Sequence, residues 1–250
     1  MSKNLIYTVA VDHPTSTFKN SNYSKYSLLT WKAWCKKNNI DFLVIDKHDE
    51  RFKFPMWNKY CIFDIVGDKY DKLALVDSDT MIKWDAPSPF VLYDNEFCGV
   101  IDRGSLRWIM NSLNAYGVFY DETVKVDLDS YINSGGIYFT KEHKFIFDNL
   151  IELYEENKDK IDEIKGVGKD QTLLNLELAK TNATKKYLPP IWNLFAIHKK
   201  NMFKHNWQLN TDSTPFFIKY AYVWHFTGFA IESRTEVMKQ VWDKFGHLYE

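Results

Sequence analysis

The first 80 residues alternate short apolar runs with stretches of helical periodicity. Apolar runs at 4–12, 40–46 and 72–77 are predicted as strands, and their near-continuous apolar character is typical of parallel strands buried on both faces. Between them, 23–39 has helical spacing, and 54–66 begins near a proline, which a helix tolerates in its first turn. This strand-helix-strand-helix-strand succession predicts an α/β domain with a doubly wound sheet and right-handed crossovers.

The rest of the chain mixes further strands and helices with turn-rich segments. No internal repeat, low-complexity tract or clear linker divides it, so we expect a single domain over 1–250. Strands are predicted at 96–102 and 131–140, and helices at 104–117, 141–161, 168–179 and 234–246.

Composition narrows the function classes. The formal net charge of −1 does not suit a nucleic-acid-binding surface. Cys35, Cys61 and Cys98 show no metal-binding spacing, which favours a reducing compartment. No apolar run in the sequence has the length of a membrane span, and the N-terminal apolar run is too short for a signal peptide, so we expect a soluble, cytoplasmic protein.

Two carboxylates follow the third predicted strand in "DKLALVDSDTMI". In an extended backbone, Asp77 and Asp79 point to the same face, where they repel unless a cation lies between them or one of them stays protonated. Ligands of open α/β sheets bind beyond the carboxyl ends of the strands, which is where this pair is expected. Two oxygen ligands on one face suit Mg²⁺ or Mn²⁺.

Two other stretches carry candidate site residues. "YVWHFTG" places His225 after an apolar run and Gly228 shortly behind it, and imidazole is a ligand that suits Mn²⁺. "YINSGGIYF" places Asn133 where the backbone has glycine freedom. A core histidine and a tight turn before a strand are the alternative interpretations.

Taken in order, four motifs resemble one family. "LALVDSDT", "YINSGGIYF", "KDQTLLN" and "VWHFTG" are similar to motifs of the retaining glycosyltransferases of the glycogenin and bacterial galactosyltransferase type, family 8. The resemblance covers about residues 4 to 230. It implies a GT-A fold, with a Rossmann-like mixed central sheet flanked by helices. It also implies a nucleotide-binding half over about 1–80 and a sugar and acceptor half over about 81–250.

The resemblance further implies a Mn²⁺ (or Mg²⁺) site and a UDP-sugar donor. The metal would be held by Asp77, Asp79 and His225, and it would help the nucleoside diphosphate to leave. Asn133, Asp170 and Gln171 would face the donor sugar, which would be transferred with retention of anomeric configuration to a glycan or other hydroxyl acceptor. The remaining donor contacts would come from Thr8, Val9, Ala10, Lys59, Ser78 and Gly228.

One departure from the family pattern concerns the diphosphate. The family often continues with a lysine three residues after the glycine, but Ile231 stands there, and Arg234 is the nearest substitute. The missing lysine leaves open a nucleotide-sugar-binding protein without turnover. The stretch "VDSDT" also resembles the acidic pair of haloacid dehalogenase-type phosphatases, which leaves that function open, although there the pair normally follows the first strand and not the third.

Aromatic residues are dense between 187 and 226. Sugar rings stack well on aromatic faces, so we expect one or two of Trp192, Phe195 and Trp207 to line a saccharide acceptor groove, with His198 as a polar contact. The alternative is that these rings are core residues.

Overall fold

The computed structural model describes residues 3–12, 22–197 and 214–250. Within these residues the central sheet has the strand order β2-β1-β3-β6-β5-β7, and β4 pairs separately with β8. The strands are β1 (Asn4–Val9), β2 (Asp41–Ile45), β3 (Lys72–Val76), β4 (Thr80–Ile82), β5 (Phe97–Ile101), β6 (Ile132–Thr140), β7 (Lys185–Tyr187) and β8 (Val223–His225).

Strand β6 is the one that makes the central sheet mixed. Strands β1, β2 and β3 are parallel, β5 and β7 are parallel, and β6 lies between β3 and β5, antiparallel to both. Val76, the last residue of β3, pairs with Gly136 in the middle of β6, so the first residues of β6 extend past the end of β3. The expected α/β fold with a mixed central sheet is confirmed.

Side chains of β3 alternate between two cores. Leu73 and Leu75 pack into the core on one face of the sheet, and Ala74 and Val76 pack into the core on the other face. This is the two-residue period of an extended strand. It explains why the sequence of β3 is apolar throughout, because neither face of the strand is left to water.

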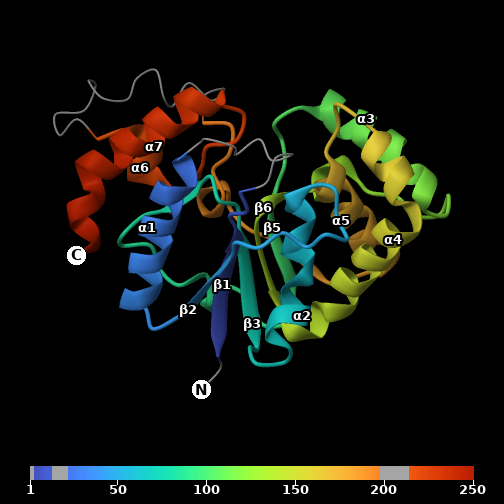
Figure 1. Cartoon of the computed structure of the whole chain (residues 1–250), viewed down its shortest axis with the longest axis horizontal. Helices are drawn as coiled ribbons and strands as arrows, with labels where there is room; N and C mark the ends of the chain where they lie inside the picture. The colour runs from blue at the N-terminus through green and yellow to red at the C-terminus, as the bar shows by residue number, and fades with distance from the viewer. Residues whose placement is uncertain (1–2, 13–21, 198–213) are drawn as a thin grey trace.

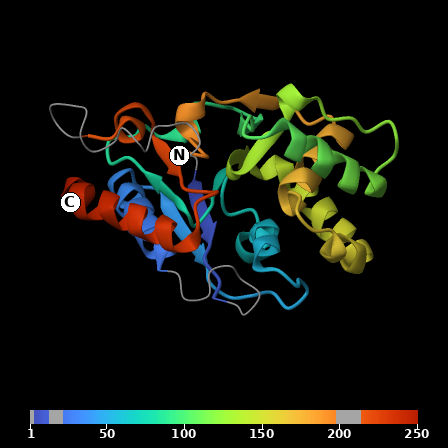
Figure 2. The same cartoon turned by 90° about the horizontal axis from the view of Figure 1, so that it is seen from above.

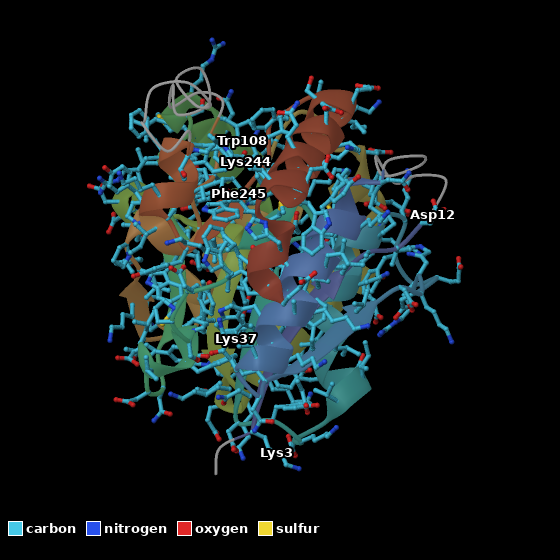
Figure 3. The ribbon with its side chains drawn as sticks, turned by 90° about the vertical axis from the view of Figure 1, so that its left-hand side faces the viewer. Lys3, Asp12, Lys37, Trp108, Lys244 and Phe245 are labelled. Carbon is cyan, nitrogen blue, oxygen red and sulfur yellow. The ribbon has the colours of Figure 1, made fainter. Side chains whose placement is uncertain are left out.

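Helices cover both faces of the sheet (Figures 1 and 2). They are α1 (Tyr23–Lys37), α2 (Ile62–Val66), α3 (Leu106–Tyr116), α4 (Lys144–Glu163), α5 (Lys169–Lys180), α6 (Phe216–Tyr220) and α7 (Ile231–Phe245). Helix α7 packs against α1 on one side, which Figure 3 shows face-on, and α3, α4 and α5 pack together on the other. No helix in these described residues is long and apolar enough to span a membrane.

The segment predicted as one helix at 54–66 is two short elements instead. A 3-10 helix, η1 (Pro55–Cys61), runs into α2, which ends at Val66 and is followed by Gly67 with φ 56°. Side chains three residues apart eclipse in a 3-10 helix. Trp57 and Tyr60 accordingly lie together in the core, with ring centroids 5.7 Å apart. Lys59, between them, is free to point toward the end of β3.

Candidate active site

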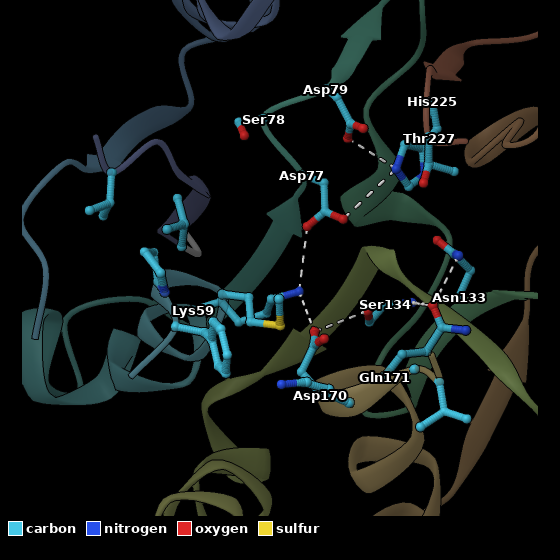
Figure 4. Close-up of a pocket in the computed structure, with 18 of the residues that line it drawn as sticks. Lys59, Asp77, Ser78, Asp79, Asn133, Ser134, Asp170, Gln171, His225 and Thr227 are labelled. Atoms are coloured by element: carbon cyan, nitrogen blue, oxygen red, sulfur yellow. Dashed lines mark hydrogen bonds and ion pairs between the residues drawn. The ribbon is translucent and has the colours of Figure 1, made fainter. Parts of the chain in front are cut away.

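A pocket opens at the carboxyl ends of β1 and β3, where the sequence predicts ligand binding (Figure 4). Its volume is about 450 Å³, within the range of small-molecule sites. It is lined by Val9, Val11, Phe54, Pro55, Met56, Lys59, Asp77, Ser78, Asp79, Trp108, Asn133, Ser134, Val167, Gly168, Lys169, Asp170, Gln171, His225 and Thr227.

A tight turn after β3 positions the two aspartates. The Thr80 N–H and Oγ1 donate to the Asp77 carbonyl (2.9 and 2.7 Å), and Trp31 Nε1 donates to Thr80 Oγ1 (3.0 Å). The chain then enters β4, whose Thr80 pairs with His225 of β8. This pairing brings a histidine from near the end of the chain beside the acidic pair.

Asp77, Asp79 and His225 converge on one point. One ligand atom from each lies within 4.8 Å of the others. His225 Nε2 is 3.1 Å from Asp79 Oδ1 and 3.8 Å from Asp77 Oδ2. Two carboxylates and an imidazole are a suitable donor set for Mn²⁺ or Mg²⁺. The three residues predicted as metal ligands are therefore brought together.

Gly135 leaves the space that this convergence needs. A Cβ at this position would lie 2.2 Å from His225 Cε1 and 2.7 Å from Asp77 Oδ2, both closer than any normal contact. The Asp77 N–H donates to the Gly135 carbonyl at 2.9 Å, so the backbone there runs directly against the acidic pair. The second residue after Asn133 in "YINSGGIYF" must be glycine for the metal ligands to meet.

Two protein cations reach the carboxylates. Lys59 Nζ lies 2.7 Å from Asp170 Oδ2 and 3.5 Å from Asp77 Oδ1, and Arg234 Nη1 lies 2.9 Å from Asp79 Oδ2. With His225 neutral, three carboxylates and two cations leave one net negative charge. A divalent ion would turn that into one net positive charge, which favours an anionic ligand.

The electrostatics of the group agree with this account. Burial raises the pKa of the Asp77 carboxyl, although Lys59 and His225 act in the opposite direction. Burial also acts to raise the pKa of Asp79, but His225 and Arg234 outweigh it, and the resulting pKa is lowered. Burial acts to lower the pKa of the His225 imidazole, and the Asp79 charge raises it by more. Asp79 is thus held in the ionised form that a metal ligand requires.

Beside the metal group lies a set of buried polar side chains. Asp170 and Gln171 are in the first turn of α5, and Asn133 and Ser134 are at the start of β6. Gln171 Oε1 accepts from the Ser134 N–H (3.1 Å) and from Asn133 Nδ2 (3.0 Å), and Ser134 Oγ donates to Asp170 Oδ2 (3.4 Å). Figure 4 shows these groups on the side of the pocket opposite Asp79.

Of the other residues predicted to contact the donor, some line the pocket and some do not. Val9, Lys59 and Ser78 line the pocket. Thr8 is fully buried in β1, and the Ala10 N–H donates to the Ile45 carbonyl at the sheet edge.

In the C-terminal motif "VWHFTG", too, only some of the residues line the pocket. Gly228, with φ 84°, follows Thr227, and of the two it is Thr227 that lines the pocket. Of the predicted contacts, Thr8, Ala10 and Gly228 thus lie beside the pocket and not in its lining.

Two of the three aromatic residues predicted to line an acceptor groove do not line one. Trp192 and Phe195 are buried in the core, and Trp192 packs edge-on against Tyr138. For these two rings the core interpretation holds, because the irregular segment that carries them folds inward under β8. His198 and Trp207 lie outside the described residues.

Two polar residues of this region are not identified by the sequence analysis. Asp102 follows β5, and its Oδ2 accepts from Gln171 Nε2 (3.0 Å) and Asn133 Nδ2 (3.3 Å). An acid at the end of a strand is the same signal that marks Asp77, but Asp102 has no second acid beside it. Asn193 follows the 3-10 helix η6 (Pro190–Trp192), and no periodicity or motif marks it.

Comparison of the sequence with family models finds no match, and none of the curated protein sequences matches either. Solved structures do resemble this one. A glycosyltransferase involved in the glycosylation of the major capsid of PBCV-1 aligns with a TM-score of 0.61 and 13% identity, over 96% of this chain and 100% of that one. The galactosyltransferase LgtC, solved with donor and acceptor sugar analogues, gives 0.52 and 17%, over 98% and 99% of the two chains.

A third structure is larger than this protein. The bifunctional glycosyltransferase WbbM aligns with a TM-score of 0.56 and 16% identity, over 99% of this chain and 51% of that one. At such identities the likeness shows the fold alone. The expected GT-A fold is thereby confirmed, and membership of family 8 stays a prediction.

Proposed function

We propose that this protein is a metal-dependent glycosyltransferase that moves a hexose from a UDP-sugar to a saccharide or other hydroxyl acceptor, with retention. The observation that carries the proposal is the convergence of Asp77, Asp79 and His225 at the sheet edge, next to the polar groups of β6 and α5. In the GT-A fold this edge is open to ligands, since it lies beyond the carboxyl ends of the parallel strands.

The proposed metal is Mn²⁺, with Mg²⁺ as the alternative. Asp77 and Asp79 supply the hard oxygen ligands, and the imidazole of His225 favours Mn²⁺ over Ca²⁺. When bound, such an ion neutralises the donor diphosphate and makes the nucleoside diphosphate a better leaving group. Gly135 supports the assignment, because the absence of its side chain keeps the ligand atoms within reach of one another.

Arg234 takes the place of the lysine that the family motif would put at Ile231. It lies one turn further along α7, and its guanidinium reaches Asp79 (2.9 Å) while also donating to the Phe229 carbonyl (3.2 Å). The guanidinium lies against Asp79 and is not part of the pocket lining, so we assign it to a diphosphate oxygen that would come to the Asp79 edge of the pocket. The cation that a diphosphate needs is present, which favours turnover over simple donor binding.

The donor sugar is assigned to the polar side of the pocket. Asn133 and Gln171 would face the sugar there, held in place by their bonds to one another and to Asp102. Asp170 would present a carboxylate to the anomeric carbon, where positive charge develops. Lys59 holds Asp170 in place through its 2.7 Å ion pair. We assign a front-face substitution. The bond from the anomeric carbon to the diphosphate oxygen breaks, the acceptor oxygen bonds from the same face, and the leaving oxygen takes the acceptor proton.

The uracil base is assigned to the apolar end of the pocket. Val9, Val11, Phe54 and Met56 line it there, and Lys169 Nζ lies 3.7 Å from the centroid of the Phe54 ring. Apolar side chains with a few polar neighbours are typical of sites for a flat heterocycle. Thr8 and Ala10 would support this wall through the backbone of β1.

A thermal-shift screen of nucleotide sugars, with and without Mn²⁺, tests the proposal. A donor at 100 times its Kd stabilises the fold by about 2.7 kcal/mol, which raises the Tm of a chain of this size by roughly 5–10 °C. We expect UDP-sugars with Mn²⁺ to give this shift. Stabilisation by non-uridine donors alone would overturn the assignment of the base, and hydrolysis of a generic phosphate ester would favour the phosphatase.

The variant Asp79→Asn identifies the site of binding. It keeps the size of the side chain but removes an ionised ligand, so the Mn²⁺-dependent shift should disappear. Asp121→Asn, at an exposed loop carboxylate outside the pocket lining, is the matched control and should keep the shift. Unchanged metal dependence in Asp79→Asn would contradict the metal assignment. Retention is tested separately, by NMR of the anomeric proton of the product.

A further inference from the structure

Four buried side chains form a hydrogen-bonded chain that ends at the proposed metal site. In order they are Asp102, Asn133, Asn193 and His225. We infer that Asn193 is a positioning residue: it keeps a hydrogen on Nδ1 of the His225 ring, so that Nε2 is the nitrogen left for a metal ion. Its own orientation is set by Asp102 through Asn133. The role of Nε2 as a ligand rests on the proposed function, whereas the position of the hydrogen follows from the hydrogen bonds alone.

The chain is anchored at one end by a group that accepts hydrogen bonds. Asp102 Oδ2 receives Nε2 of Gln171 at 3.0 Å and Nδ2 of Asn133 at 3.3 Å, and Asp102 Oδ1 receives the Gly104 N–H at 2.9 Å. An ionised carboxylate can only accept. Both amide side chains must therefore turn their nitrogen atoms toward Asp102.

A backbone group confirms the orientation of Asn133. The Gly135 N–H donates to Asn133 Oδ1 at 3.0 Å, and a backbone N–H can only donate. The oxygen and the nitrogen of Asn133 are thus assigned independently, from opposite sides. Its Oδ1 also accepts from Asn193 Nδ2 at 2.9 Å.

This leaves Asn193 with a single orientation. Its Nδ2 is committed to Asn133, so its Oδ1 faces His225 Nδ1, at 3.0 Å. An amide oxygen only accepts, so Nδ1 must carry a hydrogen. The other nitrogen, Nε2, lies 3.1 Å from Asp79 Oδ1, which is a hydrogen-bond distance, so without a metal Nε2 donates to that carboxylate, and it is the nitrogen whose hydrogen a metal ion would replace.

Turning Asn193 over would place polar atoms of the same kind against each other. Its Oδ1 would face Asn133 Oδ1, unless Asn133 also turned over. A turned Asn133 would put its oxygen against the Asp102 carboxylate and its Nδ2 against the Gly135 N–H. Asn193 is fully buried, so water does not relieve such a mismatch, which costs about 1–3 kcal/mol for each unsatisfied group.

The main chain holds Asn193 next to the histidine. The Leu194 N–H donates to the Val223 carbonyl, and the His225 N–H donates to the Leu194 carbonyl, both at 2.9 Å. The segment after η6 is thereby attached to β8. Partners of this kind orient a ligand ring, and their loss typically weakens metal affinity by about 10- to 100-fold.

The ring hydrogens are located by two-bond proton-nitrogen NMR spectra of histidine-labelled wild-type protein, without metal and with Mg²⁺, which is diamagnetic. The His225 signal is identified by its loss in His225→Gln. We expect a hydrogen on Nδ1 in both samples, because Asn193 Oδ1 faces it, and loss of the hydrogen on Nε2 when Mg²⁺ binds. A bare Nδ1 in either sample would overturn the inference, whether or not the protein is a glycosyltransferase.

Substitutions of Asn193 then test its effect on the metal, with Mn²⁺ alone as the ligand in calorimetry. Asn193→Ala removes the acceptor, so Mn²⁺ affinity should fall by about 10- to 100-fold. Asn193→Asp keeps an oxygen for Nδ1–H and should retain most of that affinity, while losing the donor to Asn133 and weakening binding of the donor sugar. Asn114→Ala, an exposed amide on α3, is the control.

The outcomes separate the two proposals. Equal Mn²⁺ affinity in wild type and Asn193→Ala would overturn the role of Asn193. Absence of Mn²⁺ binding in the wild type would instead overturn the proposed metal and leave the NMR result as the test of the hydrogen-bond chain. Loss of Mn²⁺ affinity in Asn193→Ala, together with retained Mn²⁺ affinity in Asn193→Asp, is a result that a merely structural role would not give.

Discussion

At the scale of single residues, the site depends most sharply on a position that has no side chain. We predict that Gly135→Ala abolishes Mn²⁺-dependent binding of nucleotide, because the new methyl group would overlap His225 Cε1 and Asp77 Oδ2. The free energy of unfolding should fall by about 1–3 kcal/mol, as for other overpacked interiors. Calorimetry of Mn²⁺ and UDP binding measures the first effect, and urea unfolding measures the second.

Gly117→Ala is the control for that substitution. No atom lies within 4 Å of a Cβ built there, and its φ of −57° suits any residue. It should bind like wild type and be as stable or slightly more stable. Wild-type Mn²⁺ affinity in Gly135→Ala would show that the three ligands do not act together.

Arg234 is expected to act on the metal and on the diphosphate in opposite directions. Arg234→Gln removes a positive charge 2.9 Å from a metal ligand, so Mn²⁺ alone should bind equally well or more tightly. UDP should bind more weakly in the presence of Mn²⁺, by about 10- to 150-fold, since a charge-assisted hydrogen bond contributes about 1.5–3 kcal/mol. Titration calorimetry with each ligand measures the two effects separately.

Lys239→Gln is the matched control for Arg234→Gln. It removes a positive charge from the same helix, but from an exposed pair with Asp243, and neither affinity should change. Parallel losses of Mn²⁺ and UDP affinity in Arg234→Gln would mean that Arg234 supports the metal ligands and does not bind the diphosphate.

At the scale of elements, the short 3-10 helix η5 (Lys141–His143) has a pH-dependent start. Thr140 caps it, and buried His143 Nδ1 accepts from the Thr140 N–H at 3.2 Å. Burial lowers the pKa of His143 below its ordinary value. The unfolded chain therefore binds the proton more readily. The contribution of His143 to stability is complete above the unfolded pKa of about 6.5 and is lost as the pH falls toward the lower folded pKa.

We predict that His143→Gln reduces the acid sensitivity of the fold. Glutamine is a natural partner of threonine in this kind of cap, so it can accept the same N–H without a titrating group. Thermal unfolding from neutral to mildly acidic pH should show a smaller fall in Tm for the variant than for wild type. Identical pH profiles would show that another group controls the loss of stability.

The elements also show how far the sequence goes. The strands of the first 80 residues and the acidic turn after β3 follow from the run of apolar residues and from Asp77 and Asp79. The division of 54–66 into η1 and α2 does not follow from the sequence, because the packing of Trp57 and Tyr60 in the core decides between the two helix types. Asn193 could not be found at all, since its contact with His225 exists only after the η6 segment has joined β8.

At the scale of the whole molecule, the two predicted halves are joined by strand pairing. Strand β3 pairs with β6, and β4, which begins at Thr80, pairs with β8. The two strands at the end of the first half therefore have partners from the second half. We predict that a fragment of residues 1–80 does not unfold cooperatively in urea, whereas the full chain does. Circular dichroism measures both. A sharp transition in the fragment would mean that the first half is a domain in its own right.

The antiparallel pairing of β4 with β8 also fixes the order of events during synthesis. Asp77 and Asp79 leave the ribosome long before His225, and at about 5–20 residues per second the delay is roughly 7–30 s. Until then the acidic pair has neither its third ligand nor the strand that holds the turn in place. If these residues hold a metal as proposed, an ion that meets the nascent chain would first find two carboxylates, and the third ligand would arrive only when β8 pairs with β4.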